Sequence, residues 1–148
     1  MHIRLGDFRK LSAGEDFARV GNVRTPDEYF LEVIQTIRHI HGSLLPVSIF
    51  SDGYKTELEQ VLALPRVQWM EGNSDIVDLL LLSKSRLIVA SAGSTFSYWA
   101  GFLSEGPLIL HPDHIHRRIR LNLNSDQWYE GPLMPEHPLL TKKIKEIV

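Results

Sequence analysis

Short apolar runs alternate with stretches of helical periodicity along almost the whole chain. The runs that we expect to form strands are residues 1–5, 46–50, 67–69, 86–91 and 107–110. The stretches that we expect to form helices are residues 25–42, 55–64, 75–83, 94–103 and 139–148. Because alternating strands and helices build βαβ units, the pattern predicts an α/β fold, a Rossmann-like parallel sheet with helices on both faces.

The first long helix has the strongest local signals. Thr25 is the expected N-cap, Pro26 suits the first helical position, and Glu28 is placed to complete a capping box. Gly42 is a suitable stop. Two stretches lack a regular pattern: a long polar loop at residues 9–24, and residues 111–138.

The length and the start of the chain bear on its domain organisation. With 148 residues, of which 43% are hydrophobic, we expect a single domain over residues 1–148. The first strand, however, begins almost at its carboxyl end, where ligands bind in such sheets. We therefore expect this domain to be a fragment of a longer two-domain protein.

The charge balance argues against two kinds of partner. Lys and Arg number 16 against 18 Asp and Glu, a formal net charge of −2. Such a chain has no general attraction to nucleic acid or to an anionic membrane, so we expect neither as a partner. No apolar run reaches the roughly 18 residues of a membrane span. Nothing in the sequence indicates an oligomeric state.

The chain contains no cysteine. This excludes a disulfide framework, a thiolate metal site and a thiol nucleophile. Since the first residues also lack a signal-peptide pattern, we expect a bacterial cytoplasmic protein. The lumen of the secretory pathway is the alternative if the chain is truncated.

Polar residues follow three of the expected strands. They are Arg4 to Asp7 after the first, Ser51 to Gly53 after the second, and Gly93 to Thr95 after the fourth. A helix that opens at Ser94 offers free N–H groups and a positive dipole end, and the fork of Arg4 suits a diphosphate. The alternatives are simple capping by Ser94 and a surface ion pair of Arg4.

Three short motifs resemble those of a known enzyme family. Residues 2–8 (HIRLGDF) resemble the HxRRGDY signature of the α-1,2-fucosyltransferases and of their α-1,6- and protein O-fucosyltransferase relatives. Residues 78–83 (DLLLLS), 88–90 (IVA) and 93–99 (GSTFSYW) resemble the second signature, and Ser51-Asp52 matches the SD between them. The resemblance covers about residues 2–104.

The resemblance implies the donor-binding half of a GT-B glycosyltransferase. Such an enzyme transfers fucose from GDP-fucose to a glycan hydroxyl with inversion, and it needs no metal or other cofactor. The partners implied are a nucleotide sugar and a glycan acceptor. The roles implied are β-phosphate contact for Arg4, nucleotide positioning for His2, guanine recognition for Asp78, phosphate contact for Ser94 or Thr95, and a place in the pocket lining for Asp52. Asp7 either supports Arg4 or acts as the base near the acceptor.

Two departures from the family pattern open an alternative. Leu5 replaces the second arginine of the first motif, and Gly93 stands where several relatives have asparagine. The other half of a GT-B enzyme is absent from this chain, so we expect no catalysis by the fragment alone. The alternative function is a non-catalytic nucleotide- or glycan-binding module, and the alternative for Asp78 is a solvated helix-face carboxylate.

Two other constellations suggest different chemistry. His111, Asp113, His114 and His116 contain the ligand types of a zinc site and suggest a metal-dependent hydrolase, although we prefer a polar loop near the nucleotide. A hydrolase triad built on Ser94 lacks the second glycine of the G-x-S-x-G elbow. We expect the tryptophans to pack in the core or at its edge, with Trp128 and its neighbour Tyr129 the best candidates for a sugar platform.

Overall fold

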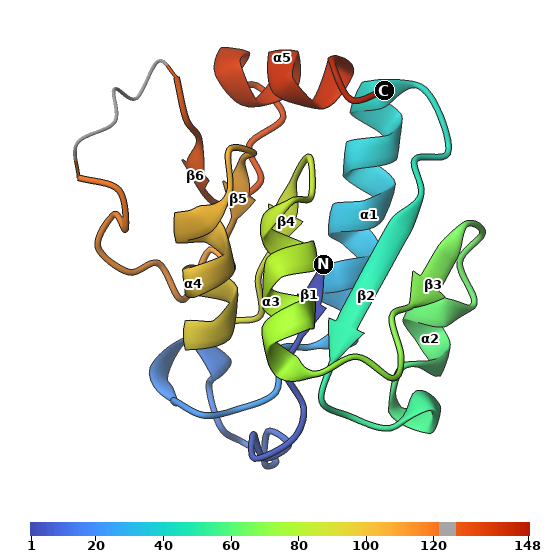
Figure 1. Ribbon diagram of the computed structural model, residues 1–148. Helices are drawn as coiled ribbons and strands as arrows, with labels where there is room; N and C mark the ends of the chain where they lie inside the picture. Colours follow the sequence, from blue (N-terminus) through green and yellow to red (C-terminus); the bar gives the residue numbers. More distant parts are fainter. Residues whose placement is uncertain (122–126) are drawn as a thin grey trace.

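The computed structural model describes residues 1–121 and 127–148 (Figure 1). The strands are β1 (His2–Ile3), β2 (Val47–Ser51), β3 (Val67–Trp69), β4 (Ile88–Val89), β5 (Leu108–Ile109) and β6 (Glu130–Gly131). The α-helices are α1 (Asp27–His41), α2 (Glu59–Leu62), α3 (Asp75–Ser83), α4 (Thr95–Leu103) and α5 (Pro138–Lys145). Two short 3₁₀ helices, η1 (Phe17–Arg19) and η2 (Lys55–Glu57), complete the order.

All strand pairs in the described residues are parallel and form two three-stranded sheets, β1-β2-β3 and β4-β5-β6. The hydroxyl of Ser91 joins β1 to the end of β4: it accepts the N–H of Arg4 at 2.8 Å and donates to the carbonyl of His2 at 3.0 Å. The strands thus follow the order β3-β2-β1-β4-β5-β6 (Figure 1). This is the doubly wound order, in which the winding direction reverses between β1 and β4.

Helices cover both faces of this arrangement. α3 and α4 pack side by side on one face, and α1 lies on the other with α2 and α5 against it (Figure 1). Because successive strand residues point to opposite faces, Ile49 and Val89 join the core under α1, whereas Phe50 and Ile88 join the core under α3 and α4. The predicted α/β fold, Rossmann-like with helices on both faces, is confirmed.

The predicted capping of the first long helix is wrong. Pro26, not Thr25, is the N-cap of α1, and no side chain caps this end of the helix. Thr25 is buried, and its hydroxyl accepts the N–H of Ala92 at 2.9 Å, in the loop after β4. A contact between distant segments therefore replaces the local one. Gly42 ends α1 as predicted, with φ of 82°.

Two other predicted segments differ from the structure. Residues 55–64 are not one helix but η2 followed by the single turn of α2, because the Glu57 carboxylate accepts the N–H of Tyr54 at 2.9 Å and binds Arg24. The stretch predicted to be irregular contains β6, which pairs with β5. A two-residue strand is too short to show an alternating pattern in the sequence.

Candidate functional site

The carboxyl ends of β1, β2 and β4 meet where the winding direction reverses. We call the residues gathered there the switch-point site: His2, Arg4, Asp7, Asp52, Ser91 and Ser94. In open α/β sheets ligands bind at this point of the strand order. Of the predicted site residues, the structure thus brings together all except Asp78 and the side chain of Thr95.

The guanidinium of Arg4 is the centre of the site. Its Nη1 lies 2.7 Å from Oδ2 of Asp52, and its Nη2 and Nε lie 2.7 and 3.1 Å from Oδ1 of Asp7. The side chains of Arg4 and Asp52 are each 31% exposed, whereas that of Asp7 is 73% exposed. Arg4 is therefore held by one sheltered carboxylate and one that faces water.

Asp52 is fixed by the backbone of the loop after β1. Its Oδ1 accepts the N–H of Leu5 at 2.8 Å. Burial raises its pKa, but hydrogen bonds from the backbone of Leu5 and Gly6 and the charge of Arg4 outweigh this, so that the pKa of Asp52 lies below its ordinary value. A Cβ on Gly6 would lie 2.2 Å from Oδ2 of Asp52, so the close approach requires glycine.

His2 binds the first turn of α4. Its Nδ1 lies 2.8 Å from Oγ of Ser97 and 3.3 Å from Oγ of Ser94, and its ring packs on Phe96 at 4.8 Å between centroids. Burial lowers the pKa of His2 to about 3, so the imidazole is neutral at physiological pH. His2 therefore positions α4 and brings no positive charge to the site.

The amino end of α4 adjoins this group. Gly93 adopts a left-handed φ of 69° just before Ser94, which is the N-cap and accepts the N–H of Ser97 at 3.3 Å. The N–H groups of Thr95 and Phe96 begin the helix and have no intrahelical acceptor. This end of α4 can receive an anion through its backbone, while the Ser94 side chain is buried and engaged in capping.

Asp78 and Thr95 stand apart from the other predicted residues. Asp78 lies on α3, where its carboxylate accepts a hydrogen bond from Nδ2 of Asn73 at 2.9 Å. In the described part of the chain, no hydrogen bond or ion pair links Asp78 to the switch-point site. Thr95 opens α4 and is exposed.

Sequence reasoning missed three hydroxyl residues, Ser91, Ser97 and Thr25. Ser91 and Thr25 hold the junction of β1, β4 and the loop after β4, and Ser97 binds His2. All three are buried. A polar residue at the end of an apolar run was the available signal for Ser91, since buried hydroxyls are normally hydrogen-bonded.

The histidine-rich segment after β5 does not converge on one point. Nε2 of His114 lies 2.8 Å from the carbonyl of Phe17, and the ring of His116 packs against Tyr98. Nδ1 of His111 and Oδ2 of Asp113 are 3.9 Å apart. Among residues 1–121 and 127–148, no three side chains of metal-ligating type are grouped to hold an ion.

The pairing of His2 with Ser94 and Ser97 has the composition of a nucleophile and its base. Both hydroxyls are buried, and Ser97 is completely so. A substrate cannot reach either hydroxyl oxygen. The arrangement therefore indicates that His2 packs against α4, and it does not favour a hydrolase triad.

The expectation that the tryptophans pack in the core or at its edge is confirmed for Trp128 and wrong for Trp99. Trp128 and Tyr129 are buried, and Nε1 of Trp128 donates to the carbonyl of Gly106 at 2.7 Å, so neither forms a sugar platform. Trp99, expected in the core or at its edge, is 62% exposed.

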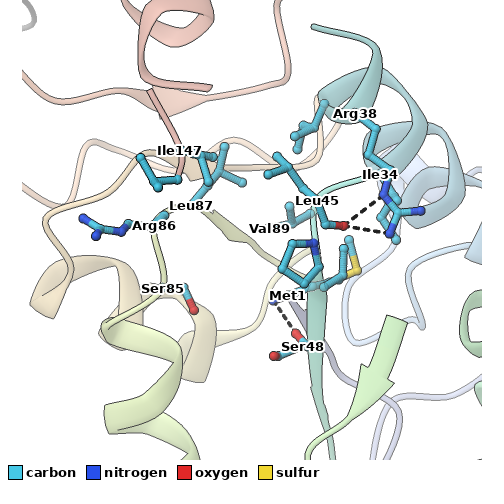
Figure 2. A pocket seen from close by; sticks show the side chains of 14 residues that line it. Met1, Ile34, Arg38, Leu45, Ser48, Ser85, Arg86, Leu87, Val89 and Ile147 are labelled. Atoms are coloured by element: carbon cyan, nitrogen blue, oxygen red, sulfur yellow. Dashed lines mark hydrogen bonds between the residues drawn. The ribbon is translucent and has the colours of Figure 1, made fainter. Parts of the chain in front are cut away.

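A hollow of about 260 Å³ lies at the opposite end of the strands, and Figure 2 shows the side chains that line it. Apolar side chains such as Ile34, Leu87 and Ile147 line it, together with Met1, whose amino group donates to the carbonyl of Ser48 at 2.9 Å. Arg38 reaches the carbonyl of Leu45 at its rim. No residue of the switch-point site lines this hollow.

No protein-family model matches the chain, and no curated protein or solved structure is significantly similar to it. The fucosyltransferase resemblance therefore rests on the three motifs. In the part of the chain that the structure describes, no helix has the length and apolar character to cross a bilayer.

Proposed function

We propose that this domain is the donor-binding half of a fucosyltransferase-like glycosyltransferase. In the complete protein it binds GDP-fucose and transfers the fucose to a glycan hydroxyl with inversion. The observation that carries the proposal is the place of Arg4 at the point where the strand order reverses, with its backbone N–H bound to Ser91 at the end of the strand that leads into α4. The motif resemblance supports the choice of donor.

Fucose transfer requires positive charge beside the departing diphosphate. The acceptor oxygen attacks the anomeric carbon and loses its proton to a base, while the bond from that carbon to the β-phosphate oxygen breaks. Negative charge grows on the departing diphosphate, and GDP leaves. Arg4 and the N–H groups that open α4 are fixed donors for this charge, in a role that a metal ion fills elsewhere.

One edge of the Arg4 guanidinium, formed by Nε and Nη2, is available to a phosphate. Asp7 holds the Nε and Nη2 edge, but it is mostly exposed, and such surface pairs contribute only about 0–1 kcal/mol. A phosphate that takes the place of Asp7 gains two parallel hydrogen bonds from the same edge. Asp52 keeps Nη1 and holds the guanidinium in position. Asp7, once released, is our candidate for the base that takes the acceptor's proton.

The remaining residues position the nucleotide. His2 fixes the first turn of α4 through Ser94 and Ser97, and Thr95 offers an exposed hydroxyl beside the phosphate. We assign guanine recognition to Asp78, because a carboxylate accepts both the N1–H and the N2–H of guanine. α3 carries Asp78 and packs directly on α4, and the proposal requires the base of a nucleotide bound at α4 to extend towards α3.

One observation favours the non-catalytic module as the second candidate. Arg4 faces two carboxylates, so the group formed by Arg4, Asp7 and Asp52 has a net charge of −1 before any ligand arrives. Leu5 supplies no second arginine to offset it. Transfer activity of the full-length protein separates the two candidates.

Calorimetric titration with GDP, UDP and ADP in EDTA tests the donor site. We expect selective binding of GDP, lost in Arg4→Ala and retained in Arg19→Ala, which removes an exposed arginine paired with Asp16. Equal binding of the three nucleotides, or GDP binding that survives Arg4→Ala, would contradict the proposal.

A further inference from the structure

The outer surface of α3 and α4 is apolar. On α3, Ile76, Val77, Leu80 and Leu81 are exposed, on the side opposite the buried Leu82. On α4, Trp99, Phe102 and Leu103 are exposed, and no charged residue occurs in the helix. Because α3 and α4 pack side by side (Figure 1), these seven side chains form one surface, which we call the α3–α4 face.

This surface is larger than a folded monomer ordinarily leaves in water. The seven residues are 40% to 62% exposed and present on the order of 700 Å² of mainly apolar area, and standard interfaces bury about 800 Å² per partner. It also has the composition of an interface core, since aromatic residues are present and charges are few. By area the face suits one specific, stable contact.

The α3–α4 face contains a hollow and a row of projecting side chains, which are the two features of a self-complementary contact. A hollow of about 300 Å³ lies beside α4, lined by Thr95, Tyr98, Trp99, Phe102 and Ile119. The row formed by Ile76 and Leu80 projects from the neighbouring helix α3. When a ridge and a hollow share one face, a two-fold rotation seats each ridge in the other copy's hollow, as an isologous interface requires.

The charges at the ends of α3 fit the same arrangement. Asp75 is exposed at its amino end and Lys84 is exposed just past its carboxyl end. Two copies related by a two-fold axis perpendicular to the helices run antiparallel, which brings Lys84 of each copy towards the amino end of the other copy's α3. Opposite charges and opposite helix dipoles then meet at the rim.

We propose that the α3–α4 face is the interface of a symmetric homodimer. The proposal does not rest on the donor function, since the exposed side chains that form the face do not include Arg4; Thr95, at the edge of the hollow, is the one residue shared with the proposed donor site. The bound copy covers Trp99 and Leu80 and leaves the ends of β1 and β2 open.

Sedimentation equilibrium over micromolar concentrations tests the dimer. The wild-type protein is expected at twice 16.9 kDa, and Leu80→Arg at 16.9 kDa. Leu44→Arg is the matched control, since Leu44 is 51% exposed and Leu80 is 50% exposed, but Leu44 lies outside the face. This control is expected to remain dimeric.

Circular dichroism establishes that each variant is folded, and Phe102→Ser supplies the same test if Leu80→Arg does not fold. Wild-type protein that stays monomeric throughout overturns the proposal and leaves the face to a different molecule. A dimer that persists in both Leu80→Arg and Phe102→Ser, or that is lost in Leu44→Arg, also overturns it.

Discussion

Nη1 of Arg4 lies 2.7 Å from Oδ2 of Asp52, and the other oxygen of the same carboxylate accepts the N–H of Leu5. The carboxylate thus ties the arginine to the backbone of its own loop. Asp7 holds the opposite edge of the guanidinium from a position exposed to water. The two carboxylates around Arg4 therefore have different roles: Asp52 orients the arginine, and Asp7 occupies the edge that a phosphate needs.

Replacing Asp7 by asparagine is expected to strengthen the binding of GDP. The change removes a negative charge beside the phosphate and frees the Nε and Nη2 edge of Arg4, and the gain expected for an exposed pair is roughly two- to fivefold. Calorimetry at low and high salt measures it, with the larger gain at low salt. Asp16→Asn, which frees the exposed Arg19 instead, is the control. Weaker binding by Asp7→Asn would show that Asp7 supports the site and does not compete with the ligand.

Alanine at Gly6 is expected to disrupt the site. Its Cβ would lie 2.2 Å from Oδ2 of Asp52, so the carboxylate or the loop must shift, and we expect the contact with Arg4 to be lost. We expect a loss of about 1–3 kcal/mol in the free energy of unfolding, measured by urea denaturation, together with loss of GDP binding. Gly21→Ala is the matched control, because no atom of the described residues lies within 4 Å of the added carbon. Unaltered GDP binding by Gly6→Ala would argue against a role for Asp52.

The buried histidine predicts how stability depends on pH. Burial lowers the pKa of His2 to about 3 from its ordinary value of 6.5. Below pH 6.5 the imidazole therefore binds a proton in the unfolded chain but not in the folded protein. The contribution of neutral His2 to the free energy of unfolding is complete above pH 6.5, and it falls by about 1.4 kcal/mol per pH unit as the pH decreases towards 3.

The amino group of Met1, whose pKa burial lowers to about 5, acts in the same direction. The share of His2 is therefore the difference between the wild-type protein and His2→Gln in urea denaturation from pH 7 to pH 5. The exposed His39, changed to Gln, serves as the control and is expected to follow the wild type. Parallel curves for wild type and His2→Gln would contradict the buried, neutral state of His2.

Ser91 is expected to matter more than its size suggests. Alanine there removes both hydrogen bonds that join β1 to the end of β4, at a buried position, and we expect a loss of about 1–3 kcal/mol in the free energy of unfolding. Ser83→Ala is the control, because the buried Ser83 hydroxyl donates to the carbonyl of Leu80 in its own helix. Equal losses in the two variants would show that Ser91 has no special role at the junction. GDP binding by Ser91→Ala is expected to weaken as well, since Arg4 follows directly from this junction.

The fold was predictable because its signals are local. The alternation of Ile49 and Phe50 between two cores follows from strand geometry, and the stop at Gly42 follows from a single backbone conformation. The capping prediction for Thr25 failed for the opposite reason. Its hydroxyl binds Ala92, 67 residues further on, and no short window of sequence contains both partners.

The site was predictable only in part. Motif order and strand ends pointed to His2, Arg4, Asp52 and Ser94, which the structure groups. Support of Arg4 by Asp7 was one of the two roles expected for that residue, and the structure shows the contact. The ion pair of Arg4 with Asp52 and the His2–Ser97 contact join segments that are far apart in the chain, and composition does not determine such geometry. Asp78 accepts a hydrogen bond from Asn73 in the structure, and its contact with a nucleotide stays a prediction.

The central claim is that a nucleoside diphosphate binds between Arg4 and the amino end of α4. Titration of ¹⁵N-labelled protein with GDP in EDTA, followed by amide and arginine side-chain NMR signals, tests it most directly. The account predicts the largest shifts at the N–H groups of Thr95 and Phe96 and at Nε of Arg4. Saturation without shifts at these atoms, or shifts confined to the hollow around Ile34 and Leu87, would contradict it.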